Sequence, residues 1–219
     1  VYNGLSLIPR YNLSISNFQK LFELYYRRKD ITIYGADLIK IEQIYEKDRN
    51  EFVKRFRTDI PRLQQDIKLN NVQNVKTFLK NFPYSINYYY DGYMEVEPPL
   101  FAAAGIWGHL EIVKALLQHP GIDVNLRIEV NSLWTGLTAL MMAAGKEGNL
   151  EVVKELLKHP KIDVNLDLNG ATTLAHAAKF GRLEIVKELL KHPKIDVNLQ
   201  GSQTALMYAA EKGHLEIVK

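Results

Sequence analysis

The sequence predicts an all-α protein in which pairs of helices repeat and stack into a solenoid, preceded by a helical segment. One observation is a nearly identical block that recurs from Gly108, Gly148 and Gly181, reading GHLEIVKALLQHPGIDVNL, GNLEVVKELLKHPKIDVNL and GRLEIVKELLKHPKIDVNL. A fourth copy, GHLEIVK, begins at Gly213. A second observation is the spacing of these glycines, 40, 33 and 32 residues, since a fixed period near 33 is typical of stacked repeats.

Each block predicts one amphipathic helix. In the segment 150–157 the apolar side chains occupy positions 150, 152, 153, 156 and 157, a helical spacing that forms one stripe, and Glu and Lys fill the other side. Such a helix cannot bury its stripe alone. A second helix rich in small residues precedes each block, and its alanines, such as Ala143 and Ala144, let the next pair approach closely. Stacking therefore builds a continuous core.

The preceding helices open with PPLFAAA at Pro98, TALMMAA at Thr138, TTLAHAA at Thr172 and TALMYAA at Thr204. Together with the recurring blocks, these segments resemble the ankyrin repeat, and the resemblance covers residues 98–219. It implies an ankyrin-repeat solenoid of stacked helix-turn-helix units. The chain departs from the family's Thr-Pro-Leu-His opening, because the His position holds Phe101, Met141, Ala175 and Met207, so the hydrogen bonds of that His are not expected here.

The same register extends upstream in a divergent copy, since Val72–Leu79 aligns with Leu110–Leu117 and Asn87 with Asn125 at a common offset of 38. The predicted array thus spans residues 61–219. Its repeats are a divergent first one at 61–98, three at about 99–137, 138–171 and 172–203, and a truncated one at 204–219. A truncated last repeat should leave its C-terminal face exposed, frayed or covered by a neighbouring chain. The chain starts without Met and stops within a helical pattern, so we interpret it as part of a longer polypeptide.

Residues 1–60 contain no period, and helical spacing predicts helices near 18–26 and 36–56. This segment is either a helical cap on the first repeat or a separate helical domain, and dimerisation through it is a third possibility. All six histidines lie beyond residue 98 and the chain has no cysteine, which removes most catalytic options for the segment.

Composition excludes several classes of protein. The chain has 219 residues, 47% of them apolar, and a net charge of +3, too weak and dispersed for a nucleic-acid surface. The absence of cysteine excludes a disulfide framework and Cys-bound zinc. No apolar run is long enough to cross a bilayer and no leader precedes Val1, so no membrane insertion is expected.

The candidate chemical groups fit structural roles. His119, His159 and His192 share the slot Leu-Leu-x-His-Pro at a helix C-terminus, where an imidazole can meet the last carbonyls, and repeat spacing keeps them too far apart to bind one metal. His109 and His214 precede a helix, which predicts turn and capping roles. The recurring Asp of the IDVN segments predicts a turn residue. We therefore expect no catalytic residue, no metal, no cofactor and no enzyme activity.

Exposed aromatic and basic residues remain as candidates for protein binding. They lie in two long connections, of 13 residues after Asn87 and 15 after Asn125, and in the turns after the small-residue helices. The candidates are Tyr90, Tyr93, Trp107, Arg127, Leu133, Trp134, Lys146, Lys179, Phe180 and Lys212. Alternatively, the long connections fold back and bury Trp107 and Trp134 in a local cluster.

The resemblance implies a non-catalytic scaffold that binds another protein through the concave side of the repeats. Because long connections and aromatic residues concentrate in the first three repeats, we expect the partner there. An alternative is a targeting module of a larger effector, enzyme or degradation adaptor whose active domain lies outside this chain. The composition is similar to that of ankyrin effectors of intracellular bacteria, which suggests an intracellular, cytoplasmic protein or one secreted into a host cytosol. The partner and the oligomeric state stay open.

Overall fold

The computed structural model describes residues 62–81, 87, 97–127, 136–168, 171–199 and 203–219. These residues belong to one compact unit that runs from Asp59 to Lys219. The helices predicted near 18–26 and 36–56 and the proposed boundary at residue 60 lie outside the described residues.

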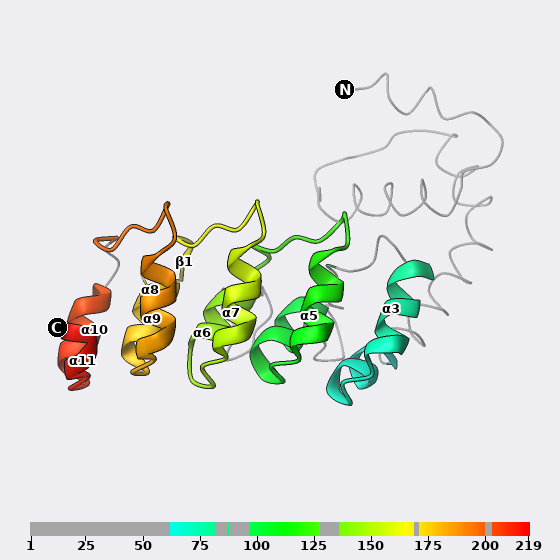
Figure 1. Cartoon of the computed structure of the whole chain (residues 1–219), viewed down its shortest axis with the longest axis horizontal. Helices are drawn as coiled ribbons and strands as arrows, with labels where there is room; N and C mark the ends of the chain where they lie inside the picture. Colours follow the sequence, from blue (N-terminus) through cyan, green and yellow to red (C-terminus); the bar gives the residue numbers. More distant parts are fainter. Residues whose placement is uncertain (1–61, 82–86, 88–96, 128–135, 169–170, 200–202) are drawn as a thin grey trace, which may run out of the picture. The chain divides into compact units, whose positions relative to one another are not determined.

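The described part of the unit consists of helix pairs laid side by side in a row (Figure 1). In each pair a short first helix is followed by a turn and a second helix. The pairs are residues 62–68 with α3 (Val72–Asn81); α4 (Pro99–Phe101) and η2 (Ala102–Ile106) with α5 (Leu110–Leu117); α6 (Ala139–Ala144) with α7 (Leu150–Leu157); α8 (Thr173–Lys179) with α9 (Leu183–Leu190); and α10 (Ala205–Glu211) with α11 (Leu215–Val218). The predicted all-α repeat fold is confirmed.

One short ladder accompanies the helices. Strand β1 (Asp167–Leu168) pairs antiparallel with β2 (Ala171–Thr172), and Asp167 lies opposite Thr172. The ladder closes the connection between α7 and α8 into a β-hairpin, and α8 begins directly after β2. This connection is shorter than the one after Asn125.

Three first helices begin with the same threonine cap. The Oγ1 atoms of Thr138, Thr172 and Thr204 accept hydrogen bonds from the backbone N–H three residues later, at 3.2, 3.2 and 3.3 Å. These bonds satisfy a helix N-terminus that would otherwise leave its donors free. The residue that donates this bond stands where the family has His, and it is apolar here. Met141, for example, packs in a small buried cluster with Phe101 and Leu137.

As predicted, the first and second helices of each pair contribute different kinds of residue to the core. First helices bury alanines, including Ala143, Ala144, Ala177 and Ala178, and second helices bury branched residues, including Ile112, Val113, Leu116, Val152, Val153, Leu156, Ile185, Val186 and Leu189. Small side chains bring neighbouring first helices closer together than neighbouring second helices. A difference of this kind predicts that the stack curves toward the first helices, so that they form its concave side.

Two repeats have one extra residue between the leucine near the start of the first helix and the turn glycine: Leu100 to Gly108 and Leu140 to Gly148 are 8 steps, against 7 from Leu174 to Gly181. The two repeats absorb this residue differently. In one, it sits inside the first helix as the π-helical turn η2, where the Trp107 N–H bonds to the Ala102 carbonyl 3.2 Å away. In the other, α6 ends at Ala144, and the extra residue enters the bend 145–147. Both routes bring the chain to the same closing bond, from His109 N–H to Ala103 O and from Asn149 N–H to Ala143 O.

An asparagine ladder links the turns that follow the second helices. The Asn125 side chain accepts from Asp163 N–H at 2.9 Å and donates to the Lys161 carbonyl at 2.7 Å. Asn87 and Asn165 bond to the next repeat in the same way. The aspartates keep each turn in shape: the carboxylates of Asp123, Asp163 and Asp196 accept from the N–H two residues later. The predicted turn role of this Asp is confirmed.

Replacing Asn165 by Ala is expected to lower the free energy of unfolding by about 1–3 kcal/mol, because two hydrogen bonds of about 0.5–1.5 kcal/mol each are lost. Asn198 holds the same position in the next repeat, and its side chain has no hydrogen-bond partner among the described residues. Asn198→Ala is thus the matched control, expected to cost less than about 0.5 kcal/mol. Urea unfolding followed by circular dichroism measures both, and equal losses would contradict the ladder's role.

Candidate protein-binding surface

The surface is built from the turns that follow the first helices. The turns carry Trp107, Lys146, Phe180 and Lys212, and Lys179 is the last residue of α8; all are exposed and all are predicted site residues. Arg127, near the start of a long connection, is half-buried. Tyr90, Tyr93, Leu133 and Trp134 lie outside the described residues, so their predicted role stays a prediction.

Trp107 occupies one end of this surface. Its indole is 42% exposed, and the Lys68 ammonium lies 5.7 Å from the ring centroid. A cation above an aromatic face contributes about 0.5–1 kcal/mol at an exposed site. The contact joins the first described helix pair to the second, so Trp107 is both a link between repeats and an exposed apolar surface.

Lys179 lies between two aromatic rings. Its ammonium is 6.0 Å from the centroid of the Phe180 ring and 5.5 Å from that of Tyr208, which belongs to the next repeat. On the other side, the His176 ring lies 6.5 Å from the Phe180 ring. Burial, and secondarily the charge of Lys179, lowers the pKa of His176, which favours the neutral imidazole.

Long side chains tie the turns together. Arg182 donates from Nε to the Gly145 carbonyl at 3.2 Å and from Nη2 to the Lys146 carbonyl. His214 Nε2 lies 3.2 Å from the Lys179 carbonyl. Because both residues precede a second helix, each holds the turn of the preceding repeat in a fixed position.

These bridges correct the capping role predicted for His109 and His214. Neither side chain caps its helix, and His109 Nε2 instead lies 3.4 Å from the Lys68 carbonyl of the preceding repeat. Asn149, in the equivalent position, performs both tasks: it accepts from Val152 N–H and donates to the Gly108 carbonyl, each at 3.2 Å. Among the described residues, the side chains of His109 and His214 thus make only the contact with the preceding repeat.

We define the basic turn cluster as Lys146, Lys179, Phe180, Arg182 and Tyr208. Within the part of the chain that the structure describes, none of its three cations contacts a carboxylate. Lys212, at the adjacent turn, is paired with Glu211 at 2.7 Å. The cluster therefore presents positive charge beside exposed aromatic surface, and Phe180 is 38% exposed.

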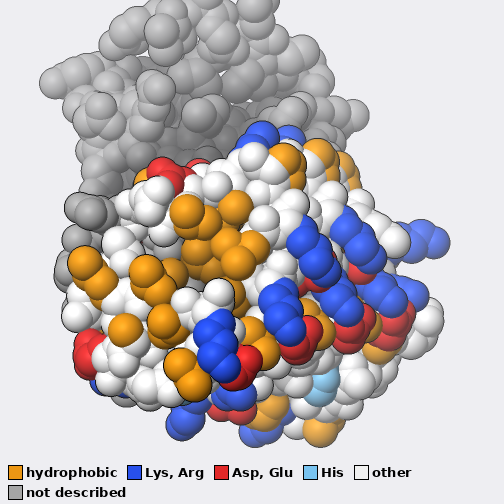
Figure 2. Space-filling model, turned by 60° about the vertical axis from the view of Figure 1, so that its left-hand side comes forward, with side chains coloured by type: hydrophobic (Ala, Val, Ile, Leu, Met, Phe, Trp, Pro, Cys, Tyr) orange, Lys and Arg blue, Asp and Glu red, His pale blue; other side chains and the backbone are white. Residues whose placement is uncertain are grey.

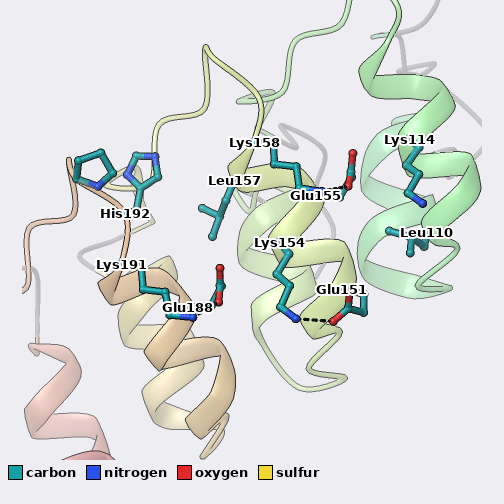
Figure 3. Close-up of a pocket in the computed structure, with 11 residues that line it drawn as sticks. Leu110, Lys114, Glu151, Lys154, Glu155, Leu157, Lys158, Glu188, Lys191 and His192 are labelled. Atoms are coloured by element: carbon teal, nitrogen blue, oxygen red, sulfur yellow. Dashed lines mark hydrogen bonds and ion pairs between the residues drawn. The ribbon is translucent and has the colours of Figure 1, made fainter.

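The second helices carry charges that neutralise one another. A groove of about 450 Å³ lies along α5, α7 and α9 (Figure 3). In it Lys154 pairs with Glu151 at 2.7 Å, and further pairs are Lys158 with Glu155 and Lys191 with Glu188. The hydrogen bond from Lys191 lowers the pKa of the Glu188 carboxyl. Figure 2 shows Lys and Arg side chains in rows beside Asp and Glu over one side of the array. This is a balanced, solvated surface.

The last helix pair exposes apolar side chains, as predicted for the truncated repeat. Leu206, Met207, Leu215 and Val218 are exposed. Figure 2, in which the C-terminal end comes forward, shows hydrophobic side chains gathered there.

The histidines of the Leu-Leu-x-His-Pro slot act as acceptors, which corrects the predicted contact with helix carbonyls. Nδ1 of His119 accepts from Gly121 N–H at 3.1 Å, and His159 and His192 accept in the same way at 3.3 Å. The carbonyl of Leu116, near the end of α5, is already bonded by the His119 N–H. The side chain is therefore free to receive the N–H of the turn.

His119 makes stability depend on pH. Its ring is buried, and Nε2 has no hydrogen-bond partner among the described residues. Burial lowers the pKa of His119 below its unfolded value of about 6.5. The unfolded chain therefore binds a proton more readily, and stability is lost as pH falls from above 6.5 through the lower folded pKa.

His119→Asn should reduce this loss, because the Asn Oδ1 can replace Nδ1 as acceptor and does not titrate. We expect the fall in unfolding free energy between pH 7.5 and pH 5 to be smaller in the variant, as measured by urea unfolding at each pH. The same fall in both proteins would contradict the assignment.

Sequence reasoning missed Tyr208, His176 and Arg182. The sequence held a signal for two of them. Each first helix has a leucine near its start, and the residue two positions later differs in every repeat, being Ala102, Met142, His176 and Tyr208, while the surrounding residues recur. Arg182 carried no such signal, because its contact with the Gly145 and Lys146 carbonyls depends on how adjacent repeats are spaced.

Stacked helix pairs with threonine caps and a turn-to-turn asparagine ladder define a helical repeat protein. The family model described as ankyrin repeats (3 copies) matches residues 100–201 and 140–219, more than half of the chain. The chain belongs to the ankyrin-repeat family. Among curated proteins none matches it.

Two further findings concern the described residues only. They contain no helix that is long and apolar enough to cross a membrane. They also contain no group of three or more His, Asp or Glu side chains placed to hold a metal ion.

Proposed function

We propose that this chain is a non-catalytic scaffold that binds a partner protein through the concave side of its repeats. Ankyrin repeats are in general protein-interaction modules and are typically non-catalytic. The observation that carries the proposal is the contrast between the two sides. The second helices pair their lysines with glutamates, whereas the basic turn cluster, at the ends of α8 and α10 and the turns beside them, exposes aromatic rings and cations that contact no carboxylate among the described residues.

Variation between repeats also favours binding of the partner on the side of the first helices. Residues that build the stack recur almost unchanged, and the segments 150–166 and 183–199 differ only at Val152 and Ile185. The positions that differ most, represented by Met142, His176 and Tyr208, lie on the first helices. A surface that differs from repeat to repeat on a constant frame suits recognition of one particular partner.

The test compares two exposed apolar side chains on opposite sides of the array. The partner is identified by proximity labelling in the native host, purified, and titrated against each variant by calorimetry. Phe180→Ala should weaken binding about 30-fold, the effect of losing an interface hot spot of about 2 kcal/mol. Leu190, on a second helix, is the matched control, and Leu190→Ala should bind as the unmodified protein does.

Trp107→Ala tests the other end of the surface in the same assay. Trp107 lies in the first three repeats, where the sequence predicts that the partner binds. Unchanged affinity in Phe180→Ala and Trp107→Ala, with both variants folded, would reject binding through this side. Three finer statements stay predictions of the sequence: targeting of an effector, enzyme or adaptor domain outside residues 1–219, an intracellular location, and a role for Tyr90, Tyr93, Leu133 and Trp134.

A further inference from the structure

We infer that the basic turn cluster binds an acidic segment of the partner protein, one that carries carboxylates next to an apolar side chain. This inference rests on the proposed function and adds the chemistry of the bound segment. The cluster, formed by Lys146, Lys179, Phe180, Arg182 and Tyr208, spans three consecutive repeats.

Lys179 and Arg182 are held by uncharged groups. Lys179 is held by the faces of Phe180 and Tyr208, and Arg182 by the carbonyls of Gly145 and Lys146. Rings and carbonyls attract a cation but carry no net charge, so they orient these groups without neutralising them. A carboxylate from outside can therefore still form a charge-assisted hydrogen bond with them.

The carboxylates nearest in sequence do not cancel this charge. Lys146 is followed by the exposed Glu147, and Lys212 is bonded to Glu211, which also accepts from Gln203. Four cations at these turns thus face two carboxylates, and one of these, Glu211, is paired with Lys212 and also attracted by the charge of Lys179. On α5, α7 and α9, by contrast, glutamate and lysine are equal in number once Lys158 and Lys191, which directly follow α7 and α9, are included. These turns therefore carry a local excess of positive charge.

The cluster is also held in place before any partner binds. The Lys179 backbone is bonded to His214, and the Arg182 guanidinium spans two carbonyls. The Phe180 ring lies near the turn of the preceding repeat, since a Cβ added at Gly145 would be 3.8 Å from it. Groups that are already ordered lose little conformational entropy on binding. The exposed Phe180 ring, next to Lys179, supplies the apolar contact that complements the charges.

The chemistry favours an acidic peptide over nucleic acid. Binding to a nucleic-acid backbone draws most of its affinity from many phosphate contacts along a stripe of cations. Here the unpaired cations gather at neighbouring turns, and the paired charges of the second helices are balanced. A short run of Asp and Glu side chains with one aromatic or aliphatic residue matches the size and composition of the cluster.

The experiment selects ligands without knowledge of the natural partner. A phage-displayed library of short random peptides is panned against the full chain, and bound phage are sequenced. We expect the enriched peptides to carry an excess of Asp and Glu together with an apolar residue. Synthetic copies should lose affinity as salt rises, because exposed charge pairs are screened.

Variants then locate the binding. Lys146→Gln with Lys179→Gln should lower the affinity for the enriched acidic peptides about 10-fold, the combined effect of two charge contacts. Lys158→Gln with Lys191→Gln removes the same charge from the second helices and should leave the affinity unchanged. An equal loss in both double variants would show a non-specific charge effect and overturn the inference.

The remaining outcomes separate the inference from the proposed function. Peptides without an acidic excess that still depend on Phe180 would overturn the inference but leave protein binding by this side intact. Binding of a phosphopeptide or a single-stranded oligonucleotide, but not of the acidic peptides, would also overturn it. If no peptide is enriched and Phe180→Ala does not affect the natural partner, both proposals fail.

Discussion

Replacing Leu189 by Ala is expected to lower the free energy of unfolding by about 2–5 kcal/mol. The Leu189 side chain on α9 has no exposed surface and packs in the continuous core of the array. Its truncation removes buried apolar surface and leaves a cavity that the stacked helices close only partly. Urea unfolding followed by circular dichroism measures the loss, and hydrogen exchange shows whether α8 and α9 open first.

Leu190 provides the control, because it is the next residue on the same helix and has the same chemistry but is 48% exposed. Leu190→Ala is expected to change the free energy of unfolding by less than about 0.5 kcal/mol. The comparison cancels differences in helix propensity between leucine and alanine. Similar losses in both variants would mean that the buried face of α9 has been assigned to the wrong side.

The second large effect is expected at Gly105, in the π-helical turn η2. A Cβ added there would lie 2.3 Å from Cβ of Met142 on the neighbouring α6 and 3.1 Å from its Cγ. Alanine normally stabilises a helix relative to glycine by about 0.5–1 kcal/mol. At this position the sign should reverse, because η2 and α6 would have to separate, and we expect a loss of about 1–3 kcal/mol.

Two backgrounds at Met142 isolate the contact. Met142→Gly removes the Cβ that the new methyl group would meet, so Gly105→Ala should cost clearly less in that background. Met142→Ala keeps this Cβ and should leave the cost of Gly105→Ala unchanged. Thermal unfolding of the single and double variants measures both, and an equal cost in the two backgrounds would rule out the clash as the cause.

Features that recur within the chain could be predicted from the sequence. The helix pairs, the buried stripe of α7 and the turn role of Asp163 all follow from local spacing that is repeated several times. The extra residue before Gly108 was visible too. Its placement as a π-helical turn was not, because the choice between the helix and the bend depends on the packing of the helix against its neighbour.

Contacts between repeats were beyond sequence reasoning. The position of Lys179 between Phe180 and Tyr208 depends on the distance between α8 and α10, which lie about thirty residues apart in the chain. The acceptor role of His119 was missed for a related reason, since the turn after α5 determines which backbone group meets the ring. Periodicity predicts which residues face a neighbour but not which atoms of that neighbour they meet.

The asparagine ladder has a consequence for how such an array can change its length. The side chains of Asn125 and Asn165 form hydrogen bonds only with main-chain atoms of the next repeat, namely the N–H of an Asp and the carbonyl of a Lys. Any unit whose turn follows the same path would be accepted as a neighbour, whatever side chains it displays elsewhere. Gene duplication or deletion of whole units could therefore lengthen or shorten the protein without matching substitutions on either side of the new joint.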